Sequence, residues 1–318
     1  MKRRILKKEE QENNRREGLI VAHYGVAVDV LFTESNEKFM VRIKRNSGHV
    51  VGDRVVVEGE VLTRLERTSE LSRMDARGGI HLVGANLDIL GIVVSCEPLP
   101  PPGFIDRAIV AARASGVQPI LVINKSDLAC FEGYYAATRP AYEESTKIFT
   151  LSAETGEGLS ALTDFFSEQH RGAFIGPTGV GKSSILNSLL PEINLQVGAI
   201  SESKKRGRHT TTVSTLHSLS GGGELIDSPG FNDFGLIDVT AAELAAYFPG
   251  FEKAGEESCR FRDCKHQTEP GCRVTDLVDK KEIKEERYNT YLQILTEVEA
   301  MLIEPKYRER RHRRKKNG

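Results

Sequence analysis

The order of four short motifs constrains this chain more than any other feature. Along the sequence stand Asn124-Lys125-Ser126-Asp127, then Ser152-Ala153, then Gly176-Pro177-Thr178-Gly179-Val180-Gly181-Lys182-Ser183, and then Asp227-Ser228-Pro229-Gly230. The glycine-rich run is typical of a phosphate-binding loop, and the other motifs complete a guanine-nucleotide site. In the usual arrangement the phosphate loop comes first and Asn-Lys-x-Asp comes late. Because the ends of a compact domain lie near each other at its surface, the rotated order predicts a circular permutation that keeps the packed site intact.

The glycine-rich run has the local context that a phosphate loop needs. Residues 172–175 are predicted to form a short buried strand before it, and an amphipathic helix begins at Ser184 and stops at Pro191. Backbone N–H groups of such a turn point at anionic oxygens. We therefore expect Gly176 to Ser184 to bind GTP, with Lys182 reaching the β- and γ-phosphates and Ser183 binding Mg²⁺. A chance glycine turn is the alternative, and the agreement of strand, loop and helix argues against it.

Recognition of the base is predicted at the ends of two apolar strands. Asn124 to Asp127 follow the apolar run 119–123, which suits a central parallel strand, and Ser152-Ala153 follow the run 148–151. Ligands of open α/β sheets bind at the carboxyl ends of the strands. The carboxylate of Asp127 can accept hydrogen bonds there from N1–H and the exocyclic amine of guanine, a donor pair that adenine lacks.

Magnesium is predicted to bind beside the phosphates. Asp227 follows a third apolar strand, residues 224–226, and a carboxylate at that position holds Mg²⁺ through water. The N–H of Gly230 is then free to meet the γ-phosphate.

The five cysteines fall into two groups. Cys259, Cys264, His266 and Cys272 lie within fourteen residues and offer the closed three-sulfur, one-nitrogen set that structural Zn²⁺ prefers. Disulfides of a secreted module are the alternative, which conflicts with the odd count and with a cytosolic nucleotide site. We therefore expect one Zn²⁺ per chain. Cys96 and Cys130 are expected to be simple buried thiols of the nucleotide domain.

The N-terminal part reads as β structure. Short β-prone runs at 19–22, 26–32, 39–44, 54–58 and 61–65 are separated by turn residues. This pattern suits a small closed barrel of the oligonucleotide-binding (OB) type, and an SH3-like barrel fits it as well. Arg42, Lys44 and Arg45 fit either a binding face or an ordinary solvated face. The extended stretch from Met74 to Gly84, with Arg77-Gly78-Gly79, is expected to be a linker.

The C-terminal part predicts one long charged helix that opens at Thr275-Asp276-Leu277, ends at Pro305 and closes the zinc module. Its packing stripe consists of Leu277, Ile283, Tyr288, Tyr291, Leu292, Leu295 and Val298. The predicted fold class is therefore multidomain α/β, with a basic tail (1–17), an OB-fold-like barrel (18–83), a circularly permuted P-loop GTPase domain (84–245), a zinc-binding helical module (246–305) and a second basic tail (306–318).

The charge and hydrophobicity of the chain indicate which kinds of partner it can bind. The chain has 318 residues, 39% of them hydrophobic, and a formal net charge of −1 that hides basic clusters at both ends. Such runs are ordinarily solvated tails, yet two of them on a nucleotide-binding core favour an RNA partner. No apolar run approaches the ~20 residues of a membrane span, and the basic start lacks an apolar signal core. We expect a cytoplasmic monomer without a membrane partner.

Together with Gly207-Arg208-His209-Thr210-Thr211-Thr212 and Cys259-Arg260-Phe261-Arg262-Asp263-Cys264-Lys265-His266, these motifs make the chain resemble the ribosome small subunit-dependent GTPase family, the RsgA or YjeQ type, over nearly its whole length. The resemblance implies hydrolysis of GTP to GDP and phosphate, stimulated by the small ribosomal subunit late in its maturation, with barrel and zinc module contacting rRNA. It also implies that residues 207–212 form the first switch, that Thr210 or Thr211 approaches Mg²⁺, and that His209 is a candidate for positioning the attacking water.

One position bears on the mechanism. Ras-like enzymes place a water-orienting Gln after the Asp-x-x-Gly glycine, and this chain has Phe231 there. Since phenylalanine cannot hydrogen-bond water, we expect slow hydrolysis by the isolated protein. His209 can supply the missing group as a neutral imidazole, or it binds only RNA or backbone. Two other functions fit the motifs: an RNA-binding zinc protein in which guanine nucleotide is a structural ligand, and a zinc-bearing DNA-binding regulator.

Overall fold

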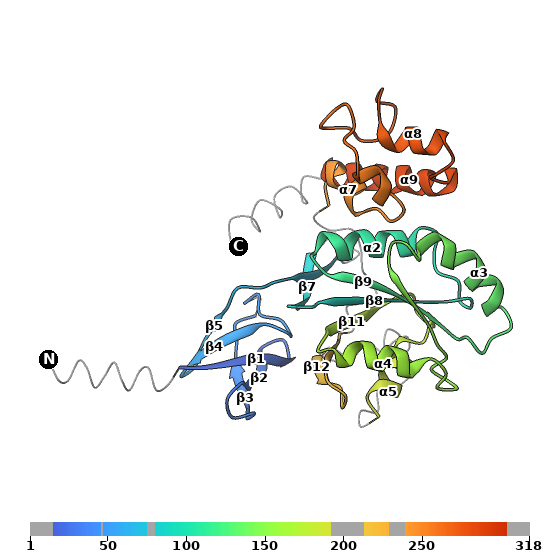
Figure 1. Cartoon of the computed structure of the whole chain (residues 1–318). Coiled ribbons are helices and arrows are strands. Elements are labelled where there is room, and N and C mark those ends of the chain that lie inside the picture. Colours follow the sequence, from blue (N-terminus) through green and yellow to red (C-terminus); the bar gives the residue numbers. More distant parts are fainter. Residues whose placement is uncertain (1–14, 46, 75–79, 192–212, 229–238, 304–318) are drawn as a thin grey trace, which may run out of the picture.

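The structure is a computed structural model that describes residues 15–45, 47–74, 80–191, 213–228 and 239–303. An N-terminal antiparallel unit, a central α/β sheet and a C-terminal helical module follow one another along the chain (Figure 1). The predicted first switch with His209, Thr210 and Thr211, the pair Gly230-Phe231, and both basic tails lie outside the described residues.

The N-terminal unit consists of the five strands that the sequence predicts. They are β1 (Arg15–His23), β2 (Ala27–Phe32), β3 (Lys38–Arg42), β4 (Arg54–Glu58) and β5 (Val61–Arg64). β1 pairs antiparallel with both β2 and β4, while β3 pairs with β2 and β5 with β4. Alternate side chains such as Ile20, Val30 and Val55 are fully buried in a core of their own, because a pleated strand sends every second residue to the same face.

The predicted linker at 74–84 is wrong for the residues that the structure describes. β6 (Glu70–Met74) and β7 (Ile80–Ala85) pair as an antiparallel hairpin, and Leu71 and Val83 are buried in the core of the central sheet. The sequence indicated only an extended segment with Arg77-Gly78-Gly79 ahead of the GTPase domain. The pairing depends instead on a partner strand that the linker interpretation did not include.

The central sheet contains β8 (Ile89–Ser95), β9 (Gln118–Asn124), β10 (Lys147–Thr150), β11 (Arg171–Ile175), β12 (Ser214–Ser218) and β13 (Glu224–Asp227). Its order is β10-β9-β8-β11-β13-β12, with β12 antiparallel to β13 and the other pairs parallel. The parallel strands are almost continuously apolar because helices cover both faces. α2 (Phe104–Ala114) and α3 (Phe131–Tyr142) lie on one face, and α4 (Leu159–Ser167) and α5 (Lys182–Leu189) on the other (Figure 1).

The central sheet continues into the N-terminal unit. β12 pairs antiparallel with β1, with Ala22 opposite Thr215 and His23 opposite Ser214. The strand beside the predicted first switch is therefore hydrogen-bonded to the N-terminal unit.

The C-terminal module is built from α7 (Ala241–Tyr247), the 3₁₀ helix η3 (Glu252–Gly255), α8 (Arg273–Asp279) and α9 (Glu285–Ile303). The single long helix predicted from Thr275 is wrong: Lys281 has φ of +62°, a left-handed conformation that ends α8 before α9 begins. The predicted packing stripe is confirmed, because its members are buried or half-buried in one core with Phe248. None of the described helices has the length and apolar character needed to cross a membrane.

The module packs on α2 through a buried ion pair. Arg287 of α9 bonds to Asp106 of α2, and the hydroxyl of Tyr142 donates to the same carboxylate at 3.0 Å. Burial raises the pKa of Asp106, although the Arg287 guanidinium opposes that shift. The buried negative charge of Asp106 is thus compensated by a cation from the C-terminal helix α9.

Candidate nucleotide and metal sites

The base-reading and phosphate-binding motifs meet at one edge of the sheet. Asn124 ends β9, Ser152-Ala153 follow β10, the loop 176–181 joins β11 to α5, and Asp227 ends β13. These strands are parallel, so their carboxyl ends share an edge, which is where such sheets bind ligands. The permutation has therefore changed the chain order without separating the motifs.

Asn124 joins three of these motifs with one side chain. Its Nδ2 donates to the carbonyl of Val180 at 2.8 Å, and its Oδ1 accepts from the N–H of Ala153 at 3.1 Å. The residue is only 2% exposed. A Cβ on Gly181 would lie 2.2 Å from the same Nδ2, so glycine is required where the phosphate loop passes the amide. The sequence predicted Asn124 as a nucleotide contact and missed this bracing role.

The carboxylate of Asp127 is oriented from the neighbouring loop. The hydroxyl of Ser152 donates to Asp127 Oδ1 at 2.5 Å, and the N–H of Ser126 donates to the carbonyl of Leu151 at 3.1 Å. Ser152 is fully buried and its Oγ also accepts from the N–H of Thr155. The predicted guanine-reading acid is thus held at a fixed place beside the Ser-Ala loop.

Lys182 occupies the first position of α5, inside the phosphate loop. Its Nζ donates to the carbonyls of Gly176 at 2.7 Å and Pro177 at 3.0 Å. Burial lowers the pKa of this ammonium to about 8. Phosphate oxygens would compensate the buried charge, which is the chemistry predicted for this lysine. Ser183 and Ser184 follow it in the first turn of the helix.

Of the residues predicted to bind Mg²⁺, Ser183 and Asp227 lie in the part of the chain that the structure describes. Asp227 ends β13, the strand next to the phosphate-loop strand β11, and burial raises the pKa of its carboxyl. A cation at this place would lower that pKa and stabilise the carboxylate. The Oγ atoms of Ser214 and Ser228 lie 2.8 Å apart and tie the ends of the two strands together.

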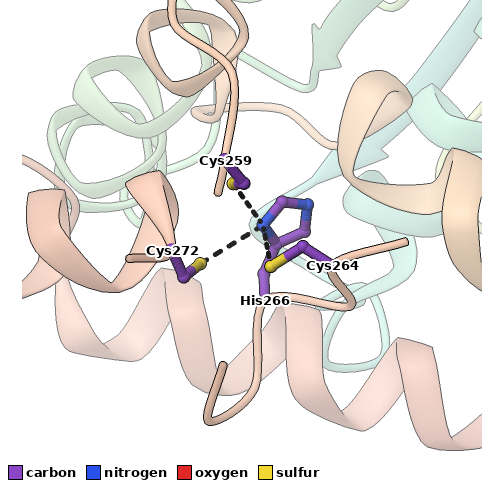
Figure 2. Close-up of side chains that lie close together, drawn as sticks. All are labelled: Cys259, Cys264, His266 and Cys272. Carbon is purple, nitrogen blue, oxygen red and sulfur yellow. Dashed lines mark hydrogen bonds between the residues drawn. The ribbon is translucent and has the colours of Figure 1, made fainter. Parts of the chain in front are cut away.

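The predicted zinc ligands converge on one point (Figure 2). The Nδ1 of His266 lies 3.5 Å from the sulfur of Cys259, 3.6 Å from that of Cys264 and 3.4 Å from that of Cys272. Tetrahedral Zn²⁺ with ordinary Zn–S and Zn–N bonds separates sulfur from nitrogen by about 3.5 Å. The four ligand atoms, all within 4.8 Å of one another, therefore fit a closed zinc site.

The surroundings of this cluster support the same ligand set. The N–H of Arg273 donates to the sulfur of Cys259 at 3.3 Å, and the hydroxyls of Tyr288 and Tyr291 in α9 donate to the carbonyls of His266 and Lys265. Burial lowers the pKa of His266, which keeps the imidazole neutral as a metal ligand must be. Sequence reasoning missed these supports because the tyrosines are distant in the chain and looked like ordinary packing residues.

Cys96 and Cys130 are joined by a disulfide, so the prediction of simple buried thiols is wrong. Cys96 follows β8 and is 7% exposed, whereas Cys130 precedes α3 and is exposed. β8 and β9 are parallel neighbours, and the loops after them meet at the same edge of the sheet. The separation of 34 residues concealed this proximity in the sequence.

Comparison with known proteins agrees with the geometry. A family model described as RsgA GTPase matches residues 64–237. The chain belongs to the RsgA GTPase family. Two curated RsgA relatives, each described as a small ribosomal subunit biogenesis GTPase, are 39% identical to it: that of Pseudomonas savastanoi pv. phaseolicola over 291 residues (87% of this chain, 84% of the relative) and that of Chromohalobacter salexigens over 290 residues (87% and 85%).

Two solved structures share this RsgA fold. YjeQ from Thermotoga maritima superposes with a TM-score of 0.72 at 30% identity, covering 89% of this chain and 98% of that one. YloQ, described as a circularly permuted GTPase, gives 0.65 at 27% identity, covering 90% and 96%. The predicted family and the mixed α/β, circularly permuted GTPase fold are thereby confirmed.

Proposed function

We propose that this protein hydrolyses GTP to GDP and phosphate, binds the small ribosomal subunit, and assists the late maturation of that subunit, which in turn stimulates hydrolysis. The observation that carries the enzymatic part is the assembly of base-reading and phosphate-binding loops around Asn124. The description of the curated relatives as small ribosomal subunit biogenesis GTPases supports the partner.

Each part of the nucleotide has a proposed set of residues. Asn124 to Asp127 with Ser152 and Ala153 would bind guanine, and Gly176 to Ser184 with Gly230 would bind the phosphates. Mg²⁺, held by Ser183, Asp227 and Thr210 or Thr211, would neutralise charge on the β- and γ-phosphate oxygens. Lys182, with its pKa lowered by burial, would regain a full positive charge beside those oxygens.

We propose that the module at 246–305 holds one Zn²⁺ through Cys259, Cys264, His266 and Cys272. The ion would be structural, since four protein ligands leave no open position for a substrate. It would fix the loop that carries Phe261, an exposed aromatic side chain between Arg260 and Arg262.

Two surfaces suit ribosomal RNA. On the proposed OB-type barrel of residues 18–83, Phe39 and Met40 of β3 are about half exposed between Lys38 and Arg42. Phe261 and its flanking arginines form a similar surface on the zinc module. Cations bind phosphates, and exposed aromatic rings stack on unpaired bases. Both surfaces are therefore better suited to single-stranded than to double-stranded RNA. We expect a cytoplasmic monomer whose GTPase domain begins near residue 84 and ends before α7, because α7 packs in the core of the C-terminal module.

A GTPase assay with and without purified small subunits tests this function. We expect slow turnover by the free protein and a rise of at least tenfold with small subunits, because a switch ordered by its partner is a common route to activation. Large subunits are the matched control and should have little effect. Turnover that small subunits leave unchanged, with GTP still bound, would instead support an RNA-binding protein in which the nucleotide is structural.

The proposed role of His209 has a separate test. Because Phe231 cannot orient water, we expect His209→Ala to lose about 10²-fold of the subunit-stimulated rate while GTP affinity is retained. Subunit binding with a non-hydrolysable GTP analogue should survive. A variant that is stimulated as well as the wild type would show that another residue or the RNA positions the water.

A further inference from the structure

The Cys96–Cys130 disulfide lies against the proposed guanine-nucleotide site, and we propose that it is a reversible thiol–disulfide switch that sets nucleotide affinity. The bond joins the loop that follows β8 to the residue that caps α3, with the two Cα atoms 5.9 Å apart. That separation lies within the usual range for a disulfide. The inference rests on the nucleotide site proposed above.

The loop after Cys96 contacts the nucleotide motifs directly. The Nζ of Lys125 donates to the carbonyl of Glu97 at 2.6 Å, so the lysine of the base motif is held by the residue next to the disulfide. Pro98 lies beside the phosphate loop, since a Cβ on Gly179 would be 3.5 Å from its ring. One short loop therefore bonds to the base-reading segment and lies close to the phosphate-binding segment.

The other half of the disulfide is connected to the same base motif. The N–H of Leu128 donates to the carbonyl of Lys125 at 3.1 Å, and the N–H of Phe131 donates to the carbonyl of Leu128 at 3.0 Å. Residues 125–131 thus form a hydrogen-bonded turn that ends beside Cys130. The disulfide closes a ring through Lys125, Glu97 and this turn, so Lys125 and Asp127 lose less freedom when a base binds.

The exposure of the two sulfurs gives an order to the chemistry. Cys130 is exposed, so its thiolate can attack a low-molecular-weight disulfide RSSR and release one RS⁻. The thiolate of Cys96 then attacks the sulfur of Cys130 in this mixed disulfide and releases a second RS⁻. In total, two cysteine thiols lose two electrons and two protons, and RSSR becomes two RSH. Excess RSH reverses both steps.

A permanent disulfide bond is not expected in a cytoplasmic protein, because the thiol pools of the cytoplasm keep most cysteines reduced. The bond would form only when the pool becomes oxidising. The oxidised form would then hold nucleotide longer and exchange it more slowly.

The test uses the full-length protein with zinc bound, equilibrated in glutathione buffers from fully reduced to oxidised. Peptide mapping after alkylation reports the Cys96–Cys130 link, and titration with a fluorescent GDP analogue reports affinity. We expect the linked form to bind about 3- to 10-fold more tightly, as for loss of freedom in a few side chains. Zinc content, measured in every buffer, should stay constant.

Cys130→Ser is the matched variant, because its side chain is exposed and the smaller hydroxyl is accommodated there. It should bind GDP like the reduced wild type in every buffer, and Cys96→Ser should behave in the same way. Free, separately alkylated Cys96 and Cys130 throughout the series would overturn the proposal, as would a linked form with unchanged GDP affinity. If neither form bound guanine nucleotide, the proposed nucleotide site itself would be wrong.

Discussion

Replacing Asn124 by alanine should loosen the whole nucleotide site, because one buried amide braces three loops. The substitution removes the hydrogen bond from Nδ2 to the Val180 carbonyl and the one from the Ala153 N–H to Oδ1. The Val180 carbonyl would then lie buried and the Ala153 N–H partly buried, each without its hydrogen-bond partner. Each lost partner costs roughly 1–2 kcal/mol, so we expect about 2–4 kcal/mol, less any part that an entering water restores.

Two measurements separate bracing from direct contact with the base. Urea unfolding of nucleotide-free Asn124→Ala should show the loss in unfolding free energy, and titration with a fluorescent GDP analogue should show weaker binding. A purely ligand-contacting side chain would change only the second. Ser126→Ala is the matched control from the same motif. The Ser126 hydroxyl is buried and has no hydrogen-bond partner, so its loss should change the free energy of unfolding by less than about 0.5 kcal/mol. Equal unfolding free energies for Asn124→Ala and wild type would refute the bracing argument.

Three further predictions concern charge and metal. Burial lowers the pKa of Lys182 to about 8, and bound phosphates should raise that pKa again. GDP affinity should therefore fall about fourfold from pH 7 to pH 8.5, and calorimetry in two buffers should show proton uptake on binding. Lys182→Met should bind GDP weakly at both pH values. Cys264→Ala should lose its zinc, as measured by elemental analysis, and its C-terminal module should unfold, because metal binding and folding are coupled in so small a unit. Retained zinc would contradict the proposed ligand set. Arg287→Leu leaves the Asp106 carboxylate, whose pKa burial already raises, without its cation. A raised carboxyl pKa favours the folded state at low pH and loses that contribution as pH rises through it, so urea unfolding should show a loss of roughly 3–5 kcal/mol at pH 7.5 and a smaller loss at pH 5.

Local pattern predicted most of the elements. The apolar runs before Asn124, Gly176 and Asp227 are strands. Four of the five N-terminal strands lie within two residues of their expected bounds, while β1 begins four residues earlier, at Arg15. These predictions succeeded because the alternation or continuity of apolar residues directly reflects burial on one or both faces of a sheet. The convergence of Cys259, Cys264, His266 and Cys272 could be predicted equally well, because their spacing is short and three thiols with one imidazole form a recognisable metal-binding set.

What the sequence could not supply were contacts between segments far apart in the chain. The disulfide of Cys96 depends on which strands are neighbours, and the bracing by Asn124 depends on where the phosphate loop passes. The break between α8 and α9 depends on a left-handed Lys281, a conformation that composition does not signal for lysine. In each case the interaction that stabilises the structure involves residues that the hydrophobic periodicity of the sequence does not identify.

The permutation determines which segments lie next to the proposed magnesium site in the chain. β12, which follows the predicted first switch, is hydrogen-bonded to β1 of the N-terminal unit, and the chain after Asp227 leads on to α7 of the C-terminal module. The Oγ–Oγ contact between Ser214 and Ser228 joins these two paths at the site itself. A displacement of β12 must therefore move β1 or break its pairing at Ala22 and His23. In the usual motif order the base-reading motif comes after Asp-x-x-Gly, whereas here the next described element is α7 of the C-terminal module. The end of β13 is thus connected along the chain to the module that carries one proposed RNA-binding surface, and through β12 by hydrogen bonds to the unit that carries the other.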